Sequence, residues 1–215
     1  MPLLLLLGLL AALPLTMPSE WEVLEYRRIP PNALRFNEGG LTISVRGSAS
    51  PIVHALAGPT AVAGVRGRGR IAGRLDTTPA RQGEQGHDDF ALRIGLVQAG
   101  TRRPTFLERR LAPGWVRRLF ALAPPGTGIQ QIRFFNVGLD ASQIGWTRRH
   151  PLSDLLLEEV VAVPDREGRF EIHLDFAPVD TLAVWLAADG DDSGSTFEVH
   201  LEALTLIPAT RGTVP

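Results

Sequence analysis

The sequence predicts a single all-β domain: a two-sheet sandwich of the jelly-roll type, with a hydrophobic N-terminal segment and one short helical excursion. From residue 20 onward, apolar and polar residues mostly alternate with a period of two, which is the pattern of strands with one buried face. Clusters of Gly, Pro and Asp separate about nine or ten such segments, and helical periodicity is almost absent. The 215 residues, 44% of them hydrophobic, suffice for one domain with a substantial core.

The N-terminal segment is an apolar run over residues 3–15. As a helix it would be about 20 Å long, shorter than the roughly 30 Å hydrocarbon core of a membrane. We therefore predict that residues 1–19 form a separate segment, and two interpretations stay open. It is either a cleaved export signal or a retained tether that buries residues such as Leu5 and Leu9 in the membrane edge or against partner subunits.

The β-domain is predicted over residues 20–208, followed by a frayed tail over residues 209–215. Residues 90–99 show the pattern most clearly, with Leu92 and Ile94 on one face and Arg93 and Gly95 on the other. The same reasoning predicts strands over residues 21–26, 41–45, 52–56, 62–75, 90–99, 130–137, 155–163, 169–176, 181–187 and 196–207.

Four arginines share one face of the strand predicted over residues 62–75: Arg66, Arg68, Arg70 and Arg74. Same-face residues on a strand are about 6.6 to 6.8 Å apart. Like charges this close need acids opposite them, with Glu158, Glu171 and Glu198 as candidates, or an anionic ligand such as a phosphate or a lipid headgroup. The glycines on the other face of this strand predict close packing there.

Residues 101–125 interrupt the β pattern and combine six arginines and one acid, Glu108, with large apolar side chains. Pro104 is expected to open a short helix that Pro113 and Gly114 break. The segment either packs its apolar side on the sandwich or docks on a membrane surface or an acidic partner. The docking residues would be Arg102, Arg103, Phe106, Arg109, Arg110, Trp115, Arg117, Arg118 and Phe120.

We predict no cofactor, with one candidate exception, a calcium ion that a D-x-D-x-S-G loop over residues 189–194 suggests. Oxygen ligands at alternate positions, here Asp189, Asp191, Asp192 and Ser193, could wrap the ion. However, His200 stands where an EF-hand needs its bidentate glutamate. An ordinary turn between two strands explains the same residues.

Two further features are candidates for polar chemistry. Asp88 and Asp89 enter the strand of Arg93. As neighbours they should point to opposite faces, and we expect one to pair with Arg93 or Arg133 and the other to be solvated. Trp146, in a predicted loop, either stacks on a sugar or caps the core.

Composition excludes several chemistries. All 22 basic residues are arginine, so a P-loop lysine, a Schiff base and a lysine general base are excluded. The absence of cysteine excludes thiolate metal sites and thiol nucleophiles. The formal charge of -1 gives no argument for nucleic acid, and no G-x-S-x-G elbow presents a serine. We therefore predict no catalytic residues.

Two segments carry a resemblance to a known family. Residues 86–93 (GHDDFALR) and 182–194 (LAVWLAADGDDSG) resemble the G-D-D-[FY]-x-x-R strand and the D-x-D-x-[ST]-G turn of a bacterial family of exported domains of unknown function. Residues 133–137 and the Ser48-Ala49-Ser50 step are similar to further motifs of that family. The resemblance implies a sandwich like those of carbohydrate-binding modules. His87 and the arginine-rich excursion depart from the pattern.

These observations lead to a non-enzymatic, membrane-associated interaction module, an accessory structural subunit of a larger bacterial membrane complex on the periplasmic side of the inner membrane. Its partners would be the membrane and membrane protein subunits. The alternative is an exported domain like a carbohydrate-binding module, secreted if residues 1–19 are cleaved and holding structural calcium. A third hypothesis is a glycosidase-type hydrolase that uses Asp88 or Asp89 with the Asp189 loop. It requires carboxylates that converge in one cleft about 5 to 9.5 Å apart.

Overall fold

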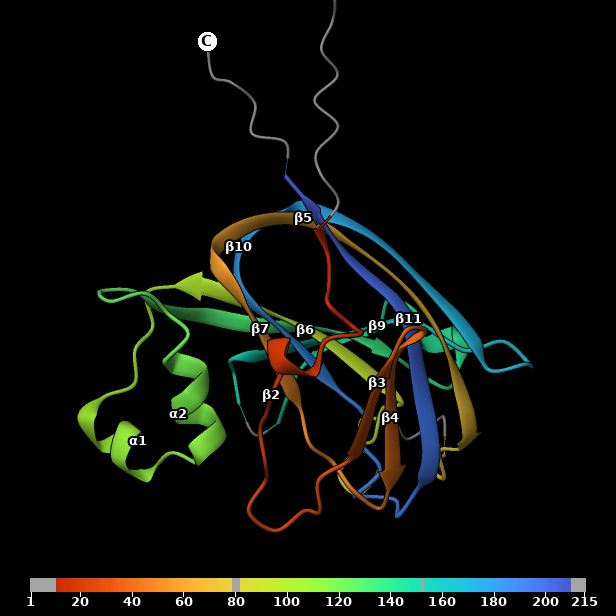
Figure 1. The fold of residues 1–215 in the computed structure, drawn as a ribbon. Helices are drawn as coiled ribbons and strands as arrows, with labels where there is room; N and C mark the ends of the chain where they lie inside the picture. Colours follow the sequence, from red (N-terminus) through yellow and green to blue (C-terminus); the bar gives the residue numbers. More distant parts are fainter. Residues whose placement is uncertain (1–10, 79–81, 152, 210–215) are drawn as a thin grey trace, which may run out of the picture.

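The computed structural model describes residues 11–78, 82–151 and 153–209 (Figure 1). It confirms the all-β fold. Eleven strands form one mixed sheet in the order β3-β4-β11-β5-β10-β6-β7-β9-β8, with β1 added to β11 and β2 to β5. The hydrogen bonds do not divide the sheet into two, so the two-sheet jelly-roll division is not established. The strands are β1 (Ala11–Ala12), β2 (Glu22–Val23), β3 (Ala33–Asn37), β4 (Gly40–Arg46), β5 (Ile52–Arg74), β6 (Leu92–Gly100), β7 (Gly128–Val137), β8 (Thr147–Arg149), β9 (Leu156–Ala162), β10 (Arg169–Ala187) and β11 (Thr196–Pro208).

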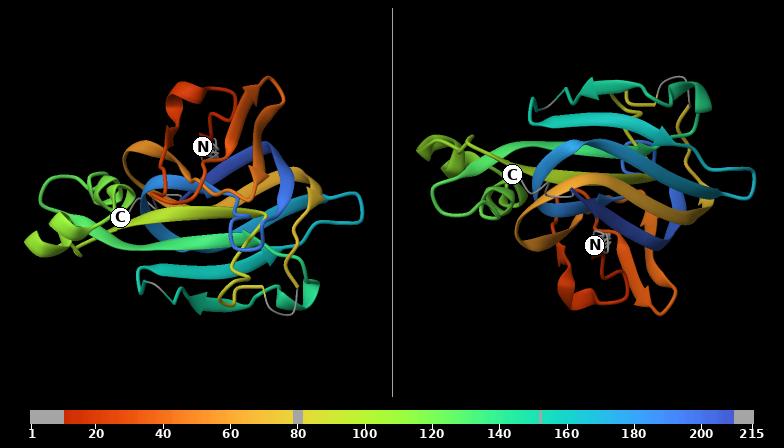
Figure 2. Two further views of the ribbon diagram at one scale, coloured as in Figure 1. Left: turned by 90° about the horizontal axis from the view of Figure 1, so that it is seen from below. Right: turned by 90° about the horizontal axis from the view of Figure 1, so that it is seen from above.

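The sheet is strongly curved because β5, β10 and β11 are long and bend (Figure 1). Figure 2 shows the β3–β4 hairpin and the β8–β9 pair on opposite sides of the layer that contains β6 and β7. Each of the long strands β5 and β10 replaces two shorter strands that the sequence predicts. Pro59 and Pro178 lie within these long strands, both where the β5–β10 register shifts, and such irregular positions tolerate a missing N–H donor.

Two apolar clusters lie on the two faces of the sheet. The larger fills the inside of the curve and includes Leu92, Ile94 and Leu96 of β6. The smaller lies on the other face of β6, β7 and β10, where Val97 and Trp185 pack beneath the helices. Of the alternation predicted for residues 90–99, the part from Leu92 to Val97 is therefore confirmed, whereas Ala91, before the strand begins, packs in the larger cluster.

The excursion forms two short helices, α1 (Phe106–Leu111) and α2 (Gly114–Phe120), separated at Pro113 as predicted. Thr105 and Glu108 form a capping box at the start of α1. Leu119 of α2 is buried in the smaller cluster, whereas Phe106, Leu107 and Leu111 of α1 are exposed. Among the described residues, no helix is both long and apolar enough to span a bilayer.

The N-terminal chain packs against the domain from residue 11 onward. Ala11 pairs with Leu206 of β11, and Leu13 and Leu15 are buried in the larger cluster. Part of the segment predicted to be separate, residues 1–19, therefore belongs to the β-domain. Leu5 and Leu9 lie outside the described residues.

Candidate ligand-binding site

The site is built on one row of cross-strand partners on the outer face of the sheet. Trp185 of β10 lies opposite Gly95 of β6, Gly95 opposite Phe134 of β7, Phe134 opposite Glu158 of β9, and Glu158 opposite Arg148 of β8. Partners in register point to the same face of a sheet. The row thus brings together residues from five strands, with apolar side chains at one end and charges at the other.

Aromatic rings form the apolar end. A Cβ on Gly95 would lie 2.7 Å from Cε1 of Phe134, so the glycine leaves room for this ring. Trp185 forms T-shaped pairs with Phe134 and Trp115 at centroid separations of 6.0 and 5.8 Å, and Trp115 forms another with Tyr26 at 6.1 Å. Such edge-to-face contacts hold the rings in fixed orientations.

Arg93, in the next row of β6, is the centre of the charged end. Its buried guanidinium binds the carboxylates of Glu158 and Asp189 and donates to Asp88 Oδ1 at 3.1 Å. The prediction that Asp88 or Asp89 pairs with Arg93 is therefore confirmed for Asp88. These acids come from three separate parts of the chain, so Arg93 joins the two motifs that carry the family resemblance.

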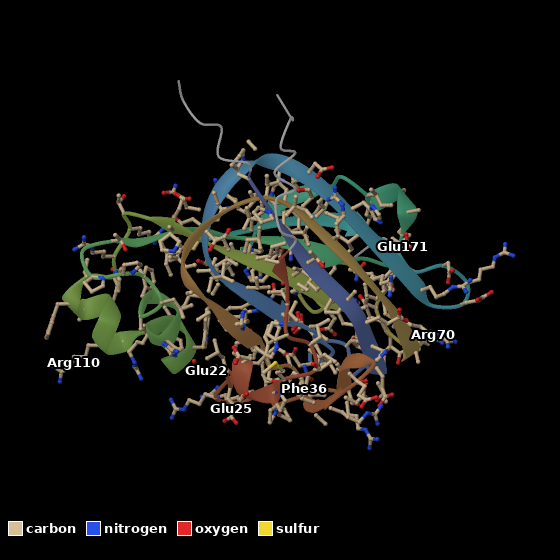
Figure 3. The ribbon with its side chains drawn as sticks, turned by 45° about the horizontal axis from the view of Figure 1, so that its top comes forward. Glu22, Glu25, Phe36, Arg70, Arg110 and Glu171 are labelled. Atoms are coloured by element: carbon tan, nitrogen blue, oxygen red, sulfur yellow. The ribbon has the colours of Figure 1, made fainter. Side chains whose placement is uncertain are left out.

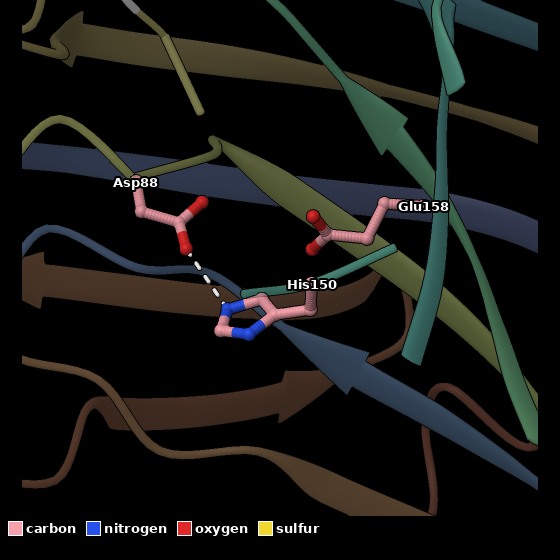
Figure 4. Close-up of side chains that lie close together, drawn as sticks. All are labelled: Asp88, His150 and Glu158. Carbon is pink, nitrogen blue, oxygen red and sulfur yellow. Dashed lines mark hydrogen bonds and ion pairs between the residues drawn. The ribbon is translucent and has the colours of Figure 1, made fainter. Parts of the chain in front are cut away.

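Arg148 and His150 complete this network. Arg148 Nε donates to Glu158 Oε2 at 2.6 Å, and its guanidinium also binds Asp88. His150 Nε2 donates to Asp88 Oδ2 at 2.9 Å (Figure 4). Burial on its own raises the pKa of Asp88, but the His150 hydrogen bond and the two guanidiniums lower it to about 2.

Asp88, His150 and Glu158 have potential metal-ligand atoms within 4.8 Å of one another. However, the oxygens of both carboxylates already accept hydrogen bonds from guanidinium or imidazole donors. A metal ion would have to displace those donors and approach two fixed positive charges. We interpret the group as an ion network and not as a metal centre.

The loop after β10 is held by Asp89. This buried carboxylate accepts from the backbone N–H of Ser193 at 2.8 Å and of Asp192 at 3.3 Å, and from the Ser193 hydroxyl. Asp89 is thus not solvated, which corrects the prediction for this residue. The predicted calcium set is divided, because Asp189 binds Arg93 and Ser193 binds Asp89, so the calcium ion stays a prediction.

A cavity of about 410 Å³ lies between the aromatic end and the acids. Burial raises the pKa of Asp189 to about 6, against the effect of Arg93, and raises the pKa of Asp191. The lining comprises Tyr26, Ile29, Ala49, Asp88, Asp89, Arg93, Trp115, Phe134, His150, Ser153, Leu156, Glu158, Trp185, Ala187, Asp189, Asp191 and Asp192. The cleft thus combines an aromatic wall with a carboxylate wall, and it collects the acids that the hydrolase hypothesis requires in one place.

The arginine-rich strand is largely balanced by local acids. Arg66 pairs with Asp175, Arg68 with Glu202 and Arg74 with Asp76, while Arg70 donates to the Glu167 carbonyl. The expected pairing with acids is found, but the partners are not Glu158, Glu171 or Glu198. Figure 3 places Arg70 and Arg110, one residue from each arginine-rich segment, at opposite ends of the molecule.

Two predicted contact residues have a different place in the structure. Trp115, predicted to dock on a membrane, turns inward to line the cavity, and Phe120 packs against the smaller core cluster. Trp146, the predicted sugar-stacking residue, does not line the cavity. Its ring lies under the guanidinium of Arg148 and against Gly83.

The remaining docking candidates lie on or beside the helices. Arg102 pairs with Asp154 and Arg118 with Glu22, while Arg117 donates to the Ala112 carbonyl. Arg103 and Arg110 are exposed, and Arg109 lies within α1. Within the described part of this region, the exposed large apolar side chains are those of α1, namely Phe106, Leu107 and Leu111.

Sequence reasoning missed Tyr26, Arg148, His150 and Trp185 as parts of the site. Their local patterns carry no signal, because each becomes a site residue only through strand register or helix packing. Glu158 was predicted only as a partner for the arginine-rich strand. An apolar run interrupted by two adjacent acids, residues 155–163, was the available hint, since a buried carboxylate needs a cation.

No family model matches the chain, and neither a curated protein nor a solved structure matches it. The resemblance to the family of exported domains therefore stays a prediction.

Proposed function

We propose that this domain is a binding module that takes a small, hydroxyl-rich ligand of carbohydrate type in the cavity beside Arg93. The observation that carries the proposal is the pairing of an aromatic wall with a carboxylate wall in a cavity of about 410 Å³. A sugar ring offers a C–H face that packs on aromatic rings, while its hydroxyls donate to carboxylates. Cavities of this size and mixed lining are typical of small-molecule sites.

Tyr26 gives the proposal a specific contact. Its ring lines the cavity, and its hydroxyl forms no hydrogen bond with another described residue. Burial, together with the nearby Asp189, raises the pKa of this phenol, so the hydroxyl is a proton donor at neutral pH. A ligand oxygen would satisfy it.

Calorimetry against a panel of neutral oligosaccharides tests the proposal. For the best ligand, we expect Tyr26→Phe to weaken binding about 3- to 10-fold and Trp115→Ala to weaken it more. Phe106→Ala, which removes an exposed ring outside the cavity, serves as the control and should bind as the parent protein does. Loss of binding in Trp146→Ala with no effect of Trp115→Ala would instead place the ligand on the β8 loop.

A second function, association with a membrane as an accessory subunit, is favoured by the surface of α1. Phe106, Leu107 and Leu111 are exposed there beside Arg103 and Arg110, a composition suited to an interface with anionic lipids. We expect the protein to sediment with vesicles containing phosphatidylglycerol, and the triple Phe106→Ser, Leu107→Ser, Leu111→Ser variant to stay in the supernatant. If the full-length protein remains soluble and alone without lipid, detergent or partner, this second proposal is wrong.

A further inference from the structure

The acids of the cavity divide into those whose charge is offset and those whose charge is not. Asp88, Glu158 and Asp189 share two guanidiniums, Arg93 and Arg148, which leaves about one negative charge on the network. These three carboxylates already have charged donors. They are therefore poor anchors for a further cation.

Asp89, Asp191 and Asp192 have no such partner. Asp89 is held by neutral N–H and O–H donors. Asp191 accepts no hydrogen bond from another described residue, and Asp192 accepts only the N–H of Asp88. Burial is the largest cause that raises the pKa of Asp191, and the nearby charge of Asp89 is the next. Among the described residues, the guanidinium of Arg93 acts in the opposite direction. This wall thus holds mutually repelling negative charges.

The opposite wall explains which cation would fit. Trp115, Trp185 and Tyr26 line the same cavity. The faces of aromatic rings attract organic cations through cation–π interactions. A calcium ion needs six to eight oxygen ligands and gains nothing from aromatic rings. An alkylammonium group on a sugar-sized body would use both walls at once.

We propose that the ligand of this cavity carries a positively charged amino group, held by Asp191 with Asp89 and Asp192, while its ring packs on Trp115. This inference rests on the proposed binding of a carbohydrate-type ligand and narrows it to amino sugars. The cavity selects the charged form because the negative charge around Asp191 is opposed by Arg93, whose guanidinium already binds three other carboxylates.

A matched pair of ligands tests this inference: cellobiose and its counterpart with an ammonium group in place of each 2-hydroxyl, the β-1,4-linked glucosamine disaccharide. In calorimetry at low salt, we expect the amino disaccharide to bind about tenfold more tightly. The advantage should shrink as salt is added. Asp191→Asn and Asp192→Asn should each reduce it, whereas Asp180→Asn, which removes an exposed charge on β10 away from the cavity lining, should leave it unchanged.

Each other outcome has a defined meaning. Equal affinity for the two disaccharides overturns the inference and leaves the proposed function intact. Binding of neither ligand, nor of any sugar in the panel, overturns both. If cellobiose binds only with added calcium and the amino disaccharide binds less well, the acids hold a metal ion and the inference is wrong.

Discussion

At the scale of residues, the charged end of the site contains more carboxylates than guanidinium groups, so each arginine pairs with more than one acid. Arg93 is buried with Glu158, whose side chain is only 1% exposed, and with Asp189 and Asp88. A buried charge is tolerated only when it is paired and hydrogen-bonded. Removing one charged side chain of this network therefore leaves its buried partners without a counter-charge. We expect the resulting loss of stability to exceed that caused by removing a surface ion pair.

Glu158→Gln keeps the shape of the side chain but removes the charge between Arg93 and Arg148. We expect it to lower the free energy of unfolding by about 3 kcal/mol. The adjacent Glu159→Gln breaks a pair with Arg133 that is about a quarter exposed, and should cost less than about 1 kcal/mol. Urea denaturation of the two variants measures the difference, and equal losses would mean that the network contributes no more than a surface pair.

Asp88 should give stability a steep acid dependence. Its pKa is about 2 in the folded protein against an ordinary 3.8, so its contribution is complete above pH 4 and is lost as the pH falls towards 2. We expect about 2 kcal/mol from this residue. Asp189 has the opposite effect because its pKa is raised to about 6: its ionisation lowers the stability as the pH rises from about 4 to 6.

Urea unfolding at a series of pH values checks this expectation. The slope between pH 4 and 2 should flatten in Asp88→Asn and persist in Asp175→Asn, which removes an exposed partner of Arg66. A parallel slope in both variants would show that other groups cause the acid dependence.

At the scale of elements, the sequence predicted strand positions better than strand continuity. The pattern of apolar residues located β4, β6, β7, β9 and β11, because each has a regular run of buried side chains. It divided β5 and β10, because a proline within a strand looks like an end unless the partner strand is known. The N-terminal strand was also missed, since the run over residues 3–15 has no alternation to distinguish a core strand from a membrane helix.

Glycines in β5 test how tightly the long strands pack. A Cβ on Gly69 would lie 2.8 Å from Cζ of Phe170 and closer still to the His200 carbonyl oxygen, whereas a Cβ on Gly58 would have no heavy atom within 4 Å. We expect Gly69→Ala to destabilise the fold by about 1 to 3 kcal/mol and Gly58→Ala to be neutral. Thermal unfolding compares them, and a stable Gly69→Ala variant would contradict the close packing of β5 against β10 and β11.

At the scale of the whole molecule, the N-terminal residues contribute to the core. Leu13 and Leu15 are 8% and 4% exposed. We expect Leu15→Ala to cost about 2 to 3 kcal/mol, and Thr16→Ala, at an exposed position beside it, to cost little. Chemical denaturation gives both values, and if Leu15→Ala is as stable as the parent protein, this segment does not belong to the core.

The candidate site could be predicted only in parts. The two motifs and the Asp88–Arg93 pair were visible, since each lies within a few residues. The convergence of Asp189, Glu158 and Trp185 was not, because it depends on which strands are neighbours and in which register. A shift of the strand register by one residue would turn the side chains of the shifted strand to the other face of the sheet.

The position of Arg93 also has a kinetic consequence. Its partners Glu158 and Asp189 lie 65 and 96 positions along the chain, so their contacts form only after β6, β9 and β10 have come together. Contacts of such long range carry the entropy of closing large loops and tend to form late in folding. We expect Glu158→Gln to accelerate unfolding while leaving the refolding rate nearly unchanged in stopped-flow measurements. The charges that shape the cavity would then determine how long the domain stays folded, and not how quickly it folds.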